Sequence, residues 1–122
     1  MNTPVISATG LWTPAESVSN EELVASFNAW ADKWNTEHAA EIEAGTVEAK
    51  THSSVEFIEK ASGIKSRFVV NKSGIVDPDT MRPDIPERSN EEISVLAEIA
   101  VNAARMALET AGRDPKEVDA VL

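Results

Sequence analysis

The chain has 122 residues, enough for one domain with a modest hydrophobic core. Its formal net charge of −10 at pH 7 argues against binding to nucleic acid phosphates and against adsorption to anionic membranes. The absence of cysteine excludes disulfides, thiolate metal sites and a cysteine nucleophile within these residues. The N-terminus lacks a basic stretch before an apolar core, and no apolar run is long enough to cross a bilayer, so we expect a cytoplasmic protein.

The N-terminal part predicts a strand, a loop and a long helix. Pro4–Gly10 is a short apolar run closed by glycine, which predicts a buried strand, and residues 11–18 predict a loop. Ser19 and Glu22 have the spacing of a capping box, and an amphipathic apolar stripe follows. The stripe consists of Leu23, Phe27, Trp30 and Trp34. Two tryptophans on such a stripe favour core packing or an interface over ligand stacking. The helix can extend as far as Ala44, with Gly45 as its stop.

The middle of the chain predicts a short helix, a strand and a loop. Ser53 and Glu56 form a second capping box, and Gly63 ends the helix that follows. Ile64–Val70 predicts a strand, with a turn at residues 71–74. The three prolines within residues 75–88 predict a long loop, a kind of segment that is often functional in compact domains.

The C-terminal part predicts a buried helix. Ser89 and Glu92 form a third capping box, and Gly112 follows the last periodic residue. The polar positions between them form one narrow line, so most of the helix surface is apolar and rich in alanine. This line consists of Glu91, Ser94, Glu98, Asn102, Arg105 and Glu109. Asp114 and Pro115 predict one further short turn, and residues 119–122 predict the start of a strand. Because a domain rarely stops inside an apolar strand, we expect the chain to be part of a longer protein.

The order of these elements is strand, helix, helix, strand, loop, buried helix, strand, which predicts an α/β fold. Few residues indicate chemistry by themselves. His38 and His52 have no partner at metal-ligand spacing, so surface positions are expected for both. Three aspartates in the proline-rich loop lack the glycine and the distal glutamate of a calcium loop, so no metal site is expected; these are Asp77, Asp79 and Asp84. Neither a phosphate-binding loop nor a nucleophile elbow is present.

A local basic patch contrasts with the acidic chain. No acid occurs between Ala61 and Val76, and four cations lie in or beside this stretch: Lys60, Lys65, Arg67 and Lys72. An anionic partner, such as a phosphate-bearing substrate or an acidic carrier protein, could dock there. The alternative is a solvated strand edge, where lysine protects against aggregation.

Four segments, in this order, resemble the N-terminal part of the beta-ketoacyl-(acyl-carrier-protein) synthase III family, condensing enzymes of the thiolase superfamily. They are VISATGLWTPAESVSNEEL, VEFIEKASGIKSRFVV, ISVLAEIAVNAARMALETAG and DPKEVDAVL. The resemblance covers most of residues 1–122 apart from two insertions, at about 36–51 and 75–87. It implies an αβαβα thiolase-like layered fold, built as a homodimer, in which the alanine-rich helix packs between sheets.

The resemblance also implies an acyltransferase of fatty acid or related lipid and polyketide biosynthesis. An acyl group would move from coenzyme A, a substrate and not a permanently bound cofactor, to a cysteine, and malonyl-acyl carrier protein would then attack with loss of carbon dioxide. The cysteine, histidine and asparagine of that chemistry match nothing in this chain, so the chain alone should be inactive.

The residues expected to contact the acyl donor are Ser53, Phe57, Lys60, Lys65 and Arg67. Phe57 stands where the family often has a tryptophan that holds the adenine of coenzyme A, and Ser53 matches a hydroxyl position near the nucleotide. Ala61 replaces an arginine of the family, which leaves room for a carrier-protein or unusual acyl donor. Two alternatives stay open. The chain could belong to a synthase of long-chain, quinolone-like or polyketide-type products, or to a non-catalytic scaffold whose acidic helices and tryptophan stripe form an interface.

Overall fold

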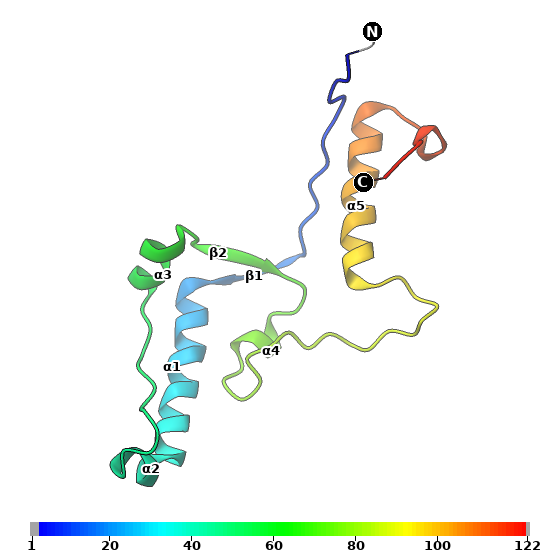
Figure 1. The fold of residues 1–122 in the computed structure, drawn as a ribbon. Helices are drawn as coiled ribbons and strands as arrows, with labels where there is room; N and C mark the ends of the chain where they lie inside the picture. The colour runs from blue at the N-terminus through cyan, green and yellow to red at the C-terminus, as the bar shows by residue number, and fades with distance from the viewer. Residues whose placement is uncertain (1–2, 122) are drawn as a thin grey trace. The chain divides into compact units, whose positions relative to one another are not determined.

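The structure is a computed structural model that describes residues 3–121. The chain divides into two compact units. The first runs from Pro14 to Pro86, and the second combines the residues up to Thr13 with those from Glu87 onward. Helices and a small sheet both occur, so the chain is a mixed α/β protein as the sequence predicted (Figure 1).

The sheet of the first unit pairs β1 (Glu16–Ser19) with β2 (Ser66–Val69) in antiparallel register, with Val18 opposite Arg67. The prediction of β2 is confirmed with shorter bounds. The prediction of a loop throughout residues 11–18 is wrong at its end, because the polar sequence of β1 becomes a strand only through this pairing.

The long helix α1 (Asn20–Glu37) begins as predicted. The Ser19 hydroxyl accepts from the Glu22 N–H at 3.2 Å, and the Glu22 carboxylate accepts from the Ser19 N–H at 3.0 Å. Helix α1 ends one residue before His38, and α2 (Ala39–Glu43) continues toward Gly45, whose positive φ of 71° suits a glycine after a helix. The predicted extension to Ala44 therefore holds, with a break at His38.

Two shorter helices follow. Helix α3 (Val55–Ser62) ends at Gly63, whose φ of 70° gives the left-handed cap that the sequence predicted. Its N-cap is Ser54 and not Ser53, so the predicted capping residue is wrong by one position. After β2, the predicted turn at 71–74 overlaps the one-turn helix α4 (Ser73–Val76), and the residues from Asp77 to Pro86 form the irregular loop that the prolines predicted.

The core of the first unit lies where α1 meets β1 and α4. Val18 and Ala31 are almost fully buried there, and so are the polar residues Asn20 and Ser26. The Asn20 side chain donates to the Ile64 carbonyl at 2.7 Å and accepts from Arg67 at 3.1 Å. A buried amide with partners for both its donor and its acceptor fixes the start of α1 against β2 without the cost of an unpaired polar group.

The second unit contains α5 (Val95–Ala111), the 3₁₀ turn η1 (Pro115–Glu117) and the N-terminal segment, which runs beside α5 (Figure 1). A Cβ on Gly10 would lie 2.0 Å from the Ala103 carbonyl oxygen and 2.6 Å from the Ala107 nitrogen, so only glycine permits this approach. Residues 4–10 form no buried strand, which makes that prediction wrong: Gly10 lies against α5, Val5 and Ile6 are exposed, and the two strands that the described residues form pair only with each other.

The ends of α5 follow local rules. Gly112 closes the helix with a φ of 64°, and Asp114 caps η1, both as predicted; the structure adds a capping box between Asp114 and Glu117. The cap lies five residues later than expected, at Ser94 and not at Ser89, because Ser89 and Glu92 close an isolated turn before the helix. The expected strand at 119–122 is absent from residues 119–121, and Leu122 lies outside the described residues.

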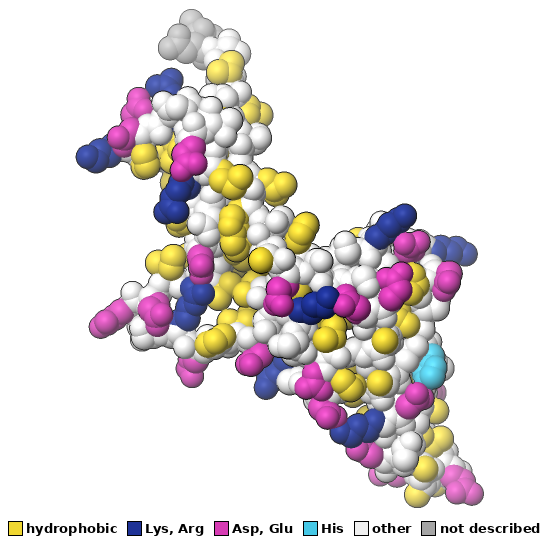
Figure 2. Space-filling view, turned by 180° about the vertical axis from the view of Figure 1, so that it is seen from behind, with side chains coloured by type: hydrophobic (Ala, Val, Ile, Leu, Met, Phe, Trp, Pro, Cys, Tyr) yellow, Lys and Arg dark blue, Asp and Glu magenta, His cyan; other side chains and the backbone are white. Residues whose placement is uncertain are grey.

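Helix α5 is not buried in this structure. No residue of α5 is buried, Leu96 is 80% exposed, and hydrophobic side chains lie on the surface of this unit (Figure 2). The predicted burial is therefore not realised by these residues. The narrow polar line that motivated it nevertheless leaves a wide apolar surface on the helix.

Candidate functional site

Two of the five predicted donor-contacting residues line one cavity of the first unit. The cavity has a volume of about 610 Å³, within the range typical of small-molecule sites. We call it the Phe57 cavity; its lining residues are Phe27, Thr51, His52, Ser53, Ser54 and Phe57. The Phe57 side chain is available to a ligand, since the residue is 67% exposed.

Local hydrogen bonds place Phe57 at this cavity. The Ser54 hydroxyl accepts from the Phe57 N–H at 3.1 Å and so fixes the first turn of α3. Ser53, immediately before that cap, is held from α1: its N–H donates to Asn28 Oδ1 at 2.8 Å, and its carbonyl accepts from Asn28 Nδ2 at 3.1 Å. Ser53 therefore lies between a helix cap and a clamp on another helix.

The clamp belongs to a row of polar residues that sequence reasoning missed. Asn35 bonds in the same way to the backbone of Lys50, accepting from its N–H at 2.8 Å and donating to its carbonyl at 2.9 Å. Between these clamps, Asp32 Oδ1 lies 2.7 Å from His52 Nε2. Residues 28, 32 and 35 have the i, i+4, i+7 spacing of one helix face, and this spacing was the available signal.

A smaller apolar cavity adjoins the first, since both include Phe27 and Ser53. It has a volume of about 250 Å³, and we call it the Met81 cavity. Its lining residues are Leu23, Val24, Phe27, Ser53, Ile58 and Met81. Met81 has a φ of 48°, an uncommon conformation for a residue with a side chain. The proline-rich loop thus contributes a wall to a cavity that α1 and α3 otherwise form.

The predicted basic residues do not line these two cavities. Lys60 and Lys65 are exposed, and Lys60 follows Phe57 by one turn of α3. Arg67 donates to Asn20 and thereby links β2 to α1. Lys72 pairs with Glu22, and this hydrogen bond, followed by the one from the Ser19 N–H, lowers the pKa of Glu22. The basic patch therefore contains two cations bound to neighbouring elements and two exposed ones.

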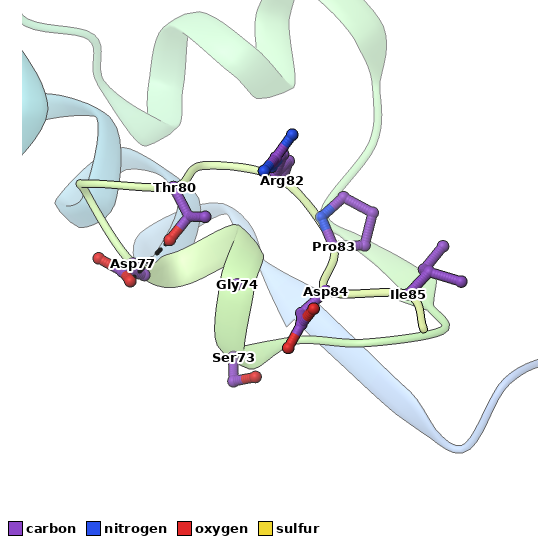
Figure 3. Close-up of a pocket in the computed structure, with 8 residues that line it drawn as sticks. All are labelled: Ser73, Gly74, Asp77, Thr80, Arg82, Pro83, Asp84 and Ile85. Atoms are coloured by element: carbon purple, nitrogen blue, oxygen red, sulfur yellow. Dashed lines mark hydrogen bonds between the residues drawn. The ribbon is translucent and has the colours of Figure 1, made fainter. Parts of the chain in front are cut away.

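The proline-rich loop encloses a third, polar cavity of about 440 Å³. Figure 3 shows the Thr80 hydroxyl directed at the Asp77 carboxylate, and this hydrogen bond, together with the one from the Asp79 N–H, lowers the pKa of Asp77. Asn71 Oδ1 accepts from the N–H groups of Gly74 and Asp84, which ties both ends of the loop together. Among residues 3–121 no three acidic or histidine side chains gather in a way that could hold a metal ion.

The two histidines serve different contacts. The His38 ring stacks on Trp34 at a centroid distance of 4.1 Å, and Lys50 lies over the same indole at 4.7 Å. His52 pairs with Asp32 at the Phe57 cavity, a partner 20 residues away that the spacing along the chain did not reveal.

Within residues 3–121, no helix has the length and apolar character that a membrane span requires.

Comparison with known proteins gives the family. No family model matches the chain. The chain is 56% identical over 97 residues to a beta-ketodecanoyl-[acyl-carrier-protein] synthase of Pseudomonas aeruginosa. The match covers 80% of this chain and 28% of the relative. This similarity confirms the resemblance to the beta-ketoacyl-acyl carrier protein synthase III family that the four motifs indicated, with the chain corresponding to a fragment of such an enzyme. It spans little more than a quarter of the length of the relative.

Proposed function

We propose that the chain forms the donor-binding part of a beta-ketoacyl synthase III-type condensing enzyme of fatty acid or related lipid biosynthesis. The observation that carries the proposal is the cavity at Phe57 and Ser53, in a chain with 56% identity to a synthase that acts in this chemistry by name. An acyl-coenzyme A would be the acyl donor, a substrate that leaves after each turnover. Malonyl-acyl carrier protein would be the second substrate.

The reaction requires groups outside these 122 residues. A cysteine thiolate would attack the donor thioester carbonyl, and the donor thiolate would leave and take up a proton. The malonyl thioester would then lose carbon dioxide, and the resulting enolate would attack the acyl-cysteine and release its thiolate. Histidine and asparagine side chains would stabilise the enolate oxygen. Because this chain contains no cysteine, its part in the reaction is to bind and orient the donor.

The predicted donor-contacting residues would bind different parts of the donor, according to their chemistry. Phe57 offers an exposed aromatic face on which an adenine ring can stack, and Ser53 offers a hydroxyl at the same cavity. Lys60 and Lys65 are exposed cations that can approach the phosphates of coenzyme A. Arg67 uses part of its guanidinium on Asn20, so we assign it a secondary place in the same phosphate contact. Ala61 carries no charge where the family often has an arginine. We therefore expect Lys60 and Lys65 to determine whether coenzyme A or a carrier protein is the acyl donor.

We further propose that the protein is a cytoplasmic homodimer with the thiolase-like αβαβα fold. In that fold α5 would be the central helix, and its wide apolar surface would pack between sheets. The alternative is a non-catalytic scaffold that uses its acidic helices and tryptophan stripe as an interface; of that stripe, Trp34 is contacted by His38 and Lys50 of this chain. If the enzyme instead makes a product of long-chain, quinolone or polyketide type, its preference among acyl donors will show this.

The test is condensation by the full-length protein that contains this chain. Acyl-coenzyme A donors of short, medium and long chain are mixed with malonyl-acyl carrier protein, and products are identified by mass, with beta-ketodecanoyl-carrier protein sought first. The Phe57→Ala variant should raise the KM for the donor about tenfold, the loss expected from one base–aromatic stack. Phe68→Ala is the matched control, because Phe68 is 63% exposed but lines neither cavity. Absence of acyl transfer from every donor would overturn the proposal.

A further inference from the structure

We propose that Asn28 is a positioning residue for the donor site: it fixes Ser53, and through it Phe57, by clamping the backbone of Ser53 to α1. The inference rests on the proposed function for its kinetic consequence. Its structural part rests only on the two hydrogen bonds between Asn28 and Ser53, at 2.8 and 3.1 Å.

The clamp acts on the backbone and so determines where the chain enters α3. One amide side chain satisfies both the N–H and the carbonyl of Ser53, as a neighbouring β-strand would do. Ser54 follows directly and caps α3 by accepting from the Phe57 N–H. Three residues after Ser54, the Phe57 ring reaches the cavity that Ser53 also lines. Loss of the clamp would free the residue before the cap, and the first turn of α3 would lose its fixed position.

The position of Asn28 on α1 adds to the argument. Its neighbour Phe27 lines both the Phe57 cavity and the Met81 cavity. Asn28 itself lines neither, so its substitution removes no contact with a bound donor. Its influence on the donor must therefore pass through Ser53, which distinguishes a positioning residue from a binding one.

The Asp32–His52 pair cannot replace this clamp. It joins two side chains that are each more than half exposed, at 54% for His52 and 66% for Asp32. A side-chain pair at the surface leaves the backbone rotations of residues 52 and 53 free, and exposed pairs of this kind contribute little to stability. The backbone of Ser53 is therefore fixed by Asn28.

The chain provides a matched control in Asn35. It makes the same two backbone bonds, at 2.8 and 2.9 Å, to Lys50, and it lies on the same face of α1, two turns further along. Asn35 lines neither the Phe57 nor the Met81 cavity, and Lys50 lies three residues before Ser53. Each substitution removes two backbone hydrogen bonds, part-buried at Ser53 and exposed at Lys50, so both should destabilise the protein, Asn28→Ala by more, while only Asn28→Ala should affect the donor.

The experiment compares Asn28→Ala with Asn35→Ala in the full-length protein that contains this chain. We expect Asn28→Ala to raise the KM for acyl-coenzyme A about tenfold while kcat changes less than about twofold, because donor binding is weakened and the chemistry is not. We expect Asn35→Ala to leave this KM within about twofold of the parent protein. A lowered thermal midpoint in Asn35→Ala with an unchanged KM would show that loss of stability alone does not weaken donor binding.

A second pair of variants provides the test if Asn28→Ala does not fold. Asn28→Asp and Asn35→Asp each keep an acceptor for the backbone N–H and lose the donor to the carbonyl, with the same change in charge. We expect only Asn28→Asp to raise the KM for the donor. Equal KM values for the two members of either pair would overturn the inference.

Amide hydrogen exchange separates failure of this inference from failure of the proposed function. If the parent protein condenses no donor, the proposed function fails, but exchange at residues 53–58 still reports on the clamp. Faster exchange there in the Asn28 variants alone would support the positioning of Ser53 and α3 by Asn28. Unchanged exchange in the Asn28 variants would overturn it, whatever the catalytic result.

Discussion

In the unit from Pro14 to Pro86, asparagine side chains bond to backbone groups far along the chain, whereas the hydrogen bonds of the unit with α5 join near neighbours. Asn20 and Asn28 reach residues 64 and 53, respectively. Among the described residues of the other unit, the side-chain hydrogen bond that joins the most distant residues in the sequence is that of Arg88 to Glu98. The four buried side chains named above all belong to the unit from Pro14 to Pro86, while no described residue of the unit with α5 is buried. Long-range polar clamps thus hold an irregular chain in place, while capped turns shape a helix whose apolar surface remains open.

The largest expected effect tests the first half of this comparison. Asn20→Ala should destabilise the first unit by about 3 kcal/mol, because it removes the partner of a buried carbonyl and of Arg67. Asn102→Ala on α5 is the control, since Asn102 makes no side-chain hydrogen bond among the described residues; it should change stability by less than about 0.5 kcal/mol. Chemical denaturation, followed by hydrogen exchange of α1, measures both. Similar losses in the two variants would remove the distinction between the units.

The next largest loss of stability is expected from substitutions at two glycines, Gly74 and Gly10. A Cβ at Gly74 would lie 2.3 Å from the Arg82 carbonyl oxygen, and Gly10 has a similar conflict with α5. Gly74→Ala should cost about 2 kcal/mol, because the loop that Asn71 ties down cannot move away without breaking its bonds. Gly10→Ala should displace the N-terminal segment and leave α5 helical, since α5 has its own caps at both ends.

Hydrogen exchange resolved by residue distinguishes these outcomes. Gly74→Ala should accelerate exchange in α4 and at the Asn71 loop, and Gly10→Ala only in the residues before Thr13. If Gly10→Ala unfolded α5, the helix would depend on the segment beside it, and the contrast between the units would be weaker than we describe.

The sequence predicted what local chemistry decides. Ser19, Gly63, Gly112 and Asp114 act at their predicted places, because a cap or a left-handed glycine requires only nearby backbone. Where two serines compete, local rules fail. Ser53 and Ser54 are equally suitable caps by type, and the clamp by Asn28, 25 residues away, leaves Ser54 as the cap.

The candidate site shows the same division. Ser53 and Phe57 could be proposed from the resemblance, and they line one cavity. The Asn28 clamp, the Asp32–His52 pair and the Met81 wall required the fold, since each joins residues at least 20 positions apart. The strand expected at Pro4–Gly10 is the converse case: the apolar run predicted a buried strand, but Val5 and Ile6 are exposed and Gly10 lies against α5.

The helix caps give a smaller effect that compares the units directly. Ser19→Ala and Ser94→Ala each remove an N-cap oxygen, which typically costs about 1 kcal/mol. We expect Ser19→Ala to affect the whole first unit, because the helix it caps carries the Asn20 and Asn28 clamps. Ser94→Ala should fray only the first turn of α5. The spread of faster hydrogen exchange beyond the first helical turn is the measurement, and equal spread in both variants would contradict this expectation.

The smallest effect is the response of Glu22 to pH. Its pKa is lowered first by the hydrogen bond from Lys72 and then by the Ser19 N–H, so the folded form binds a proton less readily than the unfolded form. Its contribution to stability is therefore present above the unfolded pKa and is lost as the pH falls through the lower, folded pKa. Glu92 in the second unit also has a lowered pKa, but the backbone N–H of Ser89 is the main cause there. Because screening shortens the range of exposed charges to about 3 Å at 1 M salt, added salt should raise the pKa of Glu22 more than that of Glu92. Carboxyl titration by NMR at low and high salt measures this difference, and an equal response would show that Lys72 contributes geometry and not charge.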